Sequence, residues 1–97
     1  MADTRLTITN RARELVASLL VPSGAPFKDY LRATDCCTAV MNYTDLEPDR
    51  EYLAQWRAAF AALMVAEPSE RVQLLRQLRN DFDRGRSPLS TLIAHRR

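Results

Sequence analysis

Residues with side chains suited to catalysis are few and far apart in this chain. It has a single histidine, His95, near its C-terminal end, and two adjacent cysteines, Cys36 and Cys37. A serine or cysteine nucleophile needs a base within hydrogen-bond reach, and nothing in the spacing brings His95 back onto Ser18 or the cysteine pair. We therefore predict no catalytic residues and a protein that is not an enzyme.

The same residue types predict neither a metal nor a cofactor. Zinc sites repeat Cys or His at short spacings and metal sites in helical bundles use a Glu-x-x-His pattern, but the chain has neither. Two glycines are too few for a glycine-rich phosphate loop. Cys37 falls on an apolar helix face, which indicates a small buried hydrophobe, whereas Cys36 on the next face could be an accessible thiol. Reduced thiols of this kind fit the cytoplasm.

The C-terminal third of the chain is its basic part. Residues 71–97 include seven basic and two acidic residues, a net charge of +5, whereas residues 28–70 include four basic and eight acidic residues, a net charge of −4. Such a segment suits nucleic acid or an acidic protein, and it also suits one helix of a bundle that pairs with an acidic neighbour. The chain has 13 Arg and a single Lys, a bias that we attribute to a GC-rich genome.

One polar helix face within this basic part has the side chains that read base edges from a major-groove helix. With the helix before it and the break at Glu67 and Pro68, the segment 69–84 resembles a helix-turn-helix motif. A proline stands where that motif has a tight glycine turn, the preceding helix is long, and the whole chain has a net charge of +2. DNA binding is therefore the alternative function, through Gln73, Arg76, Gln77, Asn80 and Arg84.

The helix around which the chain is organised is predicted over residues 48–66. It has the only Trp of the chain, and Leu53, Trp56, Phe60, Leu63 and Met64 share one face at helical spacing. Trp56 and Phe60 lie in the middle of this stripe, with apolar neighbours on both sides. We therefore place these two residues in the core.

Prolines and capping residues divide the rest of the chain into helices over residues 10–20, 26–43, 69–84 and, as a short helix or arm, 88–95. Thr44 and Glu47 form a capping-box pattern before residue 48, and Gly85 is a natural C-terminal cap. The predicted buried faces are Phe27, Tyr30, Leu31, Thr34, Cys37, Val40 and Met41 in the second helix, and Val72, Leu75, Leu78 and Phe82, with Leu74 beside them, in the fourth.

These elements predict an all-α protein, a small bundle of four to five short helices with an extended N-terminal arm. Residues 1–9 form the arm and residues 10–97 a single helical domain. The 97 residues, of which 46% are hydrophobic and 27% charged, suit one soluble domain. No apolar run is long enough to span a membrane and no secretion signal opens the chain, so we expect a cytoplasmic protein without membrane contact.

A bundle of this size leaves apolar surface uncovered, and aromatic residues, Met and Arg are enriched at protein interfaces. We therefore predict a small regulatory protein that forms a homodimer and acts by binding another protein. One example is an antiactivator that occupies the interface of a transcription factor. The predicted interface residues are those that we expect to be less embedded than Trp56 and Phe60: Tyr30, Tyr52, Leu89, Leu92 and Ile93. Tyr52 lies at the margin of its apolar stripe, and the last three residues follow the break at Gly85.

Overall fold

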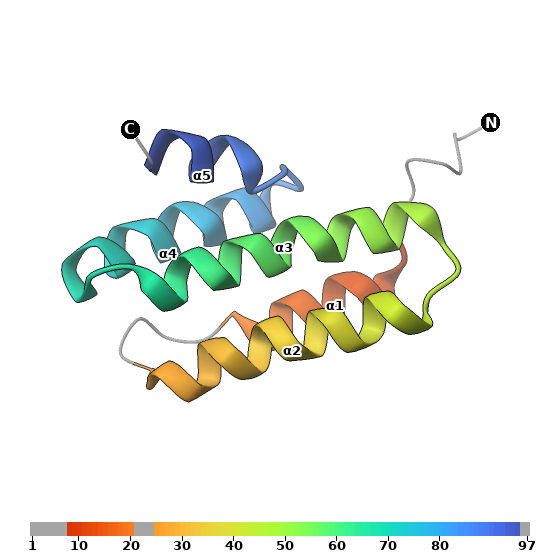
Figure 1. Cartoon of the computed structure of the whole chain (residues 1–97). Helices are drawn as coiled ribbons and strands as arrows, with labels where there is room; N and C mark the ends of the chain where they lie inside the picture. The colour runs from red at the N-terminus through yellow and green to blue at the C-terminus, as the bar shows by residue number, and fades with distance from the viewer. Residues whose placement is uncertain (1–7, 21–24, 96–97) are drawn as a thin grey trace.

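The computed structural model describes residues 8–20 and 25–95. These residues form helices only: α1 (Asn10–Leu19), α2 (Phe27–Tyr43), α3 (Glu47–Val65), α4 (Pro68–Asp83) and α5 (Leu89–His95) (Figure 1). The predicted all-α bundle is confirmed, and the helix ends agree with the sequence prediction within one or two residues. Residues 1–7 of the predicted arm lie outside the described residues, and Thr9 has the extended backbone expected of it.

Helix α3 is the centre of the bundle, and it contacts each of the other four helices. In Figure 1 it runs through the middle of the molecule, with α1 and α2 drawn below it and α4 and α5 above. Trp56 and Phe60 are fully buried, which confirms their place in the core. The Trp56 ring packs against three aromatic rings, with centroid distances of 6.4 Å to Tyr52, 6.3 Å to Phe60 and 5.9 Å to Phe82.

The buried face of α2 differs from the predicted one. Tyr30, Ala33 and Cys37 are fully buried, whereas Phe27, Leu31 and Val40 are exposed. The small side chain of Ala33 lets this side of α2 approach its neighbours closely, a contact that a count of large apolar residues misses.

The buried face of α4 is also rotated from the predicted one, because α3 and α5 both pack against this helix. Leu74, Leu75 and Leu78 are buried as a result, and Val72 is exposed.

The capping box predicted at Thr44 and Glu47 is wrong. Leu46 is the N-cap of α3, and the Glu47 carboxylate instead pairs with Arg50 at 3.0 Å. The reason is the short connection between α2 and α3, in which Thr44 already ends α2 as its C-cap. The Thr44 hydroxyl accepts only a long hydrogen bond from the backbone N–H of Leu46, at 3.4 Å.

The first three helices have no basic residue in their last turn, and arginines from other segments supply the missing donors. A helix leaves its last carbonyls without partners, and cations there also interact well with the helix dipole. Each C-cap carbonyl accepts one guanidinium N–H: Leu20 from Arg79 at 2.8 Å, Thr44 from Arg50 at 2.7 Å, and Ala66 from Arg71 at 3.0 Å. These contacts tie the ends of the helices to the rest of the bundle.

Helix α4 ends as predicted at Gly85, which has a φ of 68°. The backbone N–H of Gly85 donates to the Phe82 carbonyl at 3.1 Å, and that of Arg86 donates to the Asp81 carbonyl at 2.8 Å. This pair of bonds is a Schellman motif, which turns the chain sharply toward α5.

Candidate functional site

The structure does not bring the five predicted interface residues together. Tyr30 is fully buried, so the expectation that it is less embedded than Trp56 is wrong. The guanidinium of Arg71 stacks over the Tyr30 ring at 5.2 Å, and burial raises the pKa of its hydroxyl. Leu92 is also buried, whereas Leu89 and Ile93 are exposed on α5. Tyr52 is half-buried and lies at a different place, described below.

Beside α5 is a mainly apolar hollow of about 460 Å³, which we call the α3–α5 hollow. Its floor is made of small side chains of α3, and Leu92 forms part of the α5 wall. Val65, at the end of α3, is 78% exposed. Glu70 and His95 stand at one end, with 3.9 Å between Oε2 and Nε2. The lining residues are Ala58, Ala61, Ala62, Val65, Ala66, Glu70, Leu92 and His95.

Apolar side chains of α2 flank α3 on its other side. Arg57 of α3 donates a hydrogen bond to the Thr38 hydroxyl of α2 at 3.3 Å, so the Thr38 face of α2 is turned toward α3. Leu31 shares this face, since it lies two turns before Thr38. The two helices are antiparallel in Figure 1, which places Leu31 and the 57% exposed Phe27 toward the C-terminal end of α3.

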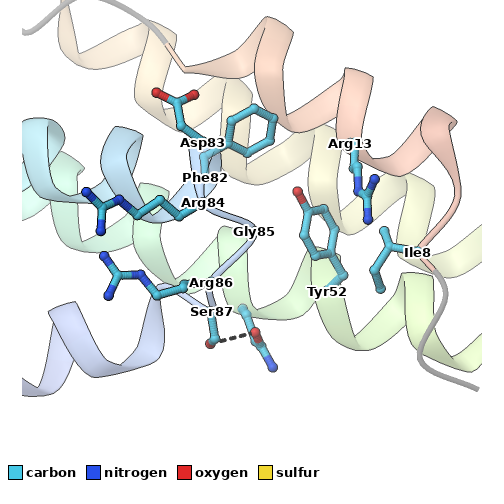
Figure 2. A pocket seen from close by; sticks show the side chains of 10 residues that line it. Ile8, Arg13, Tyr52, Phe82, Asp83, Arg84, Gly85, Arg86 and Ser87 are labelled. Atoms are coloured by element: carbon cyan, nitrogen blue, oxygen red, sulfur yellow. Dashed lines mark hydrogen bonds between the residues drawn. The ribbon is translucent and has the colours of Figure 1, made fainter.

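A second concavity, of about 670 Å³, lies where three segments of the chain meet (Figure 2). It is lined by Ile8 and Arg13 at the start of the described chain, by Tyr52 and Gln55 of α3, and by residues 82–87 at the end of α4 and in the turn that follows. We call it the Tyr52 groove. Figure 2 shows Ile8 and Arg13 on one side of Tyr52, and Arg84 and Arg86 on the other.

The charged groups of the Tyr52 groove are mainly cationic. Three arginines and the carboxylate of Asp83 line it. Burial raises the pKa of the Tyr52 hydroxyl, and the positive charge of Arg13 offsets part of this rise. Trp56 Nε1 is buried and has no hydrogen-bond partner among the described residues. The Tyr52 hydroxyl therefore stays protonated at neutral pH and can donate a hydrogen bond.

Two buried carboxylates hold the walls of this groove, and sequence reasoning missed both. Asp49 accepts the backbone N–H of Thr9 at 2.9 Å and the Thr9 hydroxyl at 2.6 Å, which fixes the chain next to Ile8. Thr9 itself caps α1, because its hydroxyl accepts the backbone N–H of Ala12 at 3.3 Å.

Asp81 holds the other wall. It accepts a hydrogen bond from the Thr91 hydroxyl, and its Oδ1 lies 3.8 Å from Arg86 Nε. The Ser87 hydroxyl also donates to Gln55 Oε1 at 2.8 Å, so the turn after α4 is tied to α3 (Figure 2).

The residues of the predicted DNA-reading face are all exposed on α4, and three of them border hollows that other segments help to line. Gln77 and Asn80 line a hollow shared with α5, and Arg84 lines the Tyr52 groove. The two main helices of a helix-turn-helix cross at roughly 90–120°. In Figure 1, α4 instead runs back along α3.

The two cysteines have different surroundings. Cys37 is fully buried, and burial raises the pKa of its thiol to about 12. Cys36 is half-buried. Within residues 8–20 and 25–95, no three His, Cys, Asp or Glu side chains are placed to hold a metal ion. No helix in the described part of the chain is both long and apolar enough to cross a membrane.

Comparisons with protein-family models, with curated proteins and with solved structures found no match to this chain. The two concavities and the exposed apolar side chains are therefore the observations from which function is argued.

Proposed function

We propose that this protein is a small cytoplasmic regulator that acts by binding another protein. One concrete form is an antiactivator that covers the interface of a transcription factor. In this proposal the chain is a homodimer, has no catalytic role and needs no metal or cofactor. The observation that carries the proposal is the apolar α3–α5 hollow, together with the exposed apolar side chains of α3, α5 and α2.

The exposed apolar side chains come from three helices. Val65 of α3 is 78% exposed, Ile93 of α5 is 58% exposed, and Phe27 and Leu31 of α2 are also exposed. The α3–α5 hollow lies beside Val65 and offers a concave apolar seat for a partner side chain. Interface hot spots sit in concave apolar pockets, and exposed apolar side chains beside such a pocket are typical of an interaction site.

The alternative, DNA binding through α4, has less support. Helix α5 lies beside Gln77 and Asn80, and Arg79 and Arg71 are engaged in capping α1 and α3. A duplex-DNA mobility shift that weakens steeply with salt would be the result that favours this alternative, because phosphate contacts release counterions.

The test of the interaction surface compares two Ala→Arg substitutions at exposed positions within helices. Ala58 lines the α3–α5 hollow, whereas Ala39 lies on the exposed face of α2, opposite Tyr30 and Cys37. Arginine is a good helix former, so both variants should stay folded. We expect Ala58→Arg to weaken association by about tenfold or more, because it places a charge in the centre of the interface, and Ala39→Arg to have little effect.

Association is measured in two ways. Sedimentation equilibrium of the purified chain reports self-association, and co-purification from the native host with mass spectrometry reports partner binding. The proposal is wrong if the parent chain is a monomer that retains no partner, or if the Ala58 and Ala39 variants cannot be distinguished.

A further inference from the structure

We propose that the Tyr52 groove is a second binding site, which takes an acidic peptide segment of a partner protein. No residue lines both this groove and the α3–α5 hollow, so this inference does not depend on the apolar surface. It depends on the shape of the groove, on its charge and on its aromatic floor.

The groove has the size and the fixed walls of a binding site. Its volume of about 670 Å³ is within the range of ligand pockets, roughly 300–1,000 Å³. Thr9 is held on Asp49, and Ser87 is held on Gln55, so both walls are attached to α3. Walls that are already ordered reduce the entropy that binding must offset.

Positive charge stands at both ends of the groove. Arg13 lies on one side of Tyr52, and Arg84 and Arg86 lie on the other (Figure 2). Neither Arg13 nor Arg84 has an ion pair with another described residue, and Arg86 has only the 3.8 Å contact with Asp81. A guanidinium presents planar donors that match a carboxylate, so both ends are suited to acidic side chains.

Between these ends the groove is aromatic and offers one hydroxyl donor. The rings of Tyr52 and Phe82 line it, and in Figure 2 the Tyr52 hydroxyl lies between Phe82 and Arg13. In a peptide with an apolar residue between two acidic residues, the apolar side chain would cover these rings, and the two carboxylates would meet the arginines. An extended peptide with that alternation fits the whole groove.

Nucleic acid fits the same observations less well. Proteins that bind duplex DNA commonly contact about six to ten phosphates, whereas this groove offers three guanidinium groups and also contains the carboxylate of Asp83. The positive charge of the groove can therefore pair with a short acidic segment, but it is too small to neutralise the phosphates that a duplex-binding protein contacts.

The experiment uses the full chain and three synthetic probes without Trp or Tyr. The acidic probe is acetyl-Asp-Glu-Leu-Phe-Asp-Glu-amide, the neutral probe replaces its acidic residues by Asn and Gln, and the third probe is a short random-sequence duplex DNA. Titration calorimetry measures binding. Fluorescence of Trp56 shows whether the peptide binds in the groove, because Trp56 is the only Trp of the chain and packs against the rings of Tyr52 and Phe82 that line it.

We expect the acidic peptide to bind with a saturable change in Trp56 fluorescence, and the neutral peptide to bind at least about tenfold more weakly. Arg13→Gln should lower the affinity for the acidic peptide by about tenfold. Tyr52→Phe, which removes only the hydroxyl, should lower this affinity by several-fold. Arg76→Gln is the matched control, because Arg76 is exposed on α4 and does not line the groove; its affinity should equal that of the parent.

Five outcomes would overturn the proposal. The first is no calorimetric binding of the acidic peptide, and the second is equal binding of the neutral peptide. In the third, the Arg13 and Arg76 variants behave alike. In the fourth, duplex DNA binds and the peptide does not, which assigns the groove to nucleic acid. If deletion of residues 2–7 is needed before the peptide binds, the groove belongs to the chain's own N-terminal segment, and the proposal is likewise wrong.

Discussion

Replacing Arg71 by lysine tests whether the arginine caps stabilise this bundle. Arg71 Nε donates to the Leu63 carbonyl at 2.9 Å, Nη2 donates to the Ala66 carbonyl at 3.0 Å, and the guanidinium stacks over Tyr30. A lysine keeps the positive charge near the end of α3. Its single ammonium group cannot reproduce the planar pair of donors or the same stacking.

The expected cost follows from these contacts. A hydrogen bond to a charged group contributes about 1.5–3 kcal/mol, and a cation–π contact about 0.5–2 kcal/mol. Because lysine can keep one hydrogen bond and Arg71 is partly exposed, we expect Arg71→Lys to lower the free energy of unfolding by about 2 kcal/mol. For a domain of this size that corresponds to a fall in Tm of roughly 8–16 °C.

Urea unfolding followed by circular dichroism at the helix band measures this change. Arg76→Lys, on the same helix, is the control, because Arg76 is exposed and makes no hydrogen bond or ion pair with another described residue. It should shift stability by less than about 0.5 kcal/mol. Equal stability of the Arg71→Lys and Arg76→Lys variants would refute the capping argument.

Two further predictions concern the core. Trp56→Ala should lower the free energy of unfolding by about 3–5 kcal/mol. Trp56→Phe should cost much less, since the buried Nε1 has no described hydrogen-bond partner to lose. A folded Trp56→Ala chain that has lost only its association would place Trp56 at an interface instead. A thiol reagent at pH 8 should modify Cys36 well before Cys37. Burial raises the pKa of the Cys37 thiol from 9.0 to about 12, so this thiol ionises at a lower pH in the unfolded chain than in the folded chain. Its contribution to stability should therefore fall as the pH rises through this range. Equal modification rates would contradict the buried position.

The helices could be predicted from the sequence because their limits are local. Pro26, Pro48 and Pro68 stand at or next to the first residues of α2, α3 and α4, and Gly85 supplies the left-handed residue that ends α4. Each of these residues restricts the backbone at its own position, whatever surrounds it.

The buried faces were harder to predict, because a helix face is buried by its neighbours and not by its own composition. Tyr30 is in the core because α2 turns the side with Ala33 and Cys37 inward, and that rotation depends on how α2 packs against α3. Val72 is exposed for a similar reason, since both α3 and α5 contact α4. Periodicity alone gives the spacing of a stripe but not its exact angle.

The Tyr52 groove was outside the reach of sequence reasoning, because its walls come from the two ends of the described chain. Ile8 and Arg86 line the same concavity. The carboxylates beside them, Asp49, which binds Thr9, and Asp81, which lies next to Arg86, stand in ordinary helical segments. A buried carboxylate has no sequence signature when its partners are a backbone N–H and threonine hydroxyls from distant positions.

The arginines explain why the basic part of the chain does not by itself indicate nucleic acid. Arg71 and Arg79 donate to carbonyls at the ends of α3 and α1, and Arg86 lies next to Asp81. These contacts direct much of the charge of residues 71–86 into the fold itself. Among these arginines, Arg76 and Arg84 are the two for which the described residues show no such contact, and Arg84 lines the Tyr52 groove. A ligand there meets a small, localised positive charge next to aromatic rings, which is the reason that a short acidic peptide suits this protein better than a polyanion.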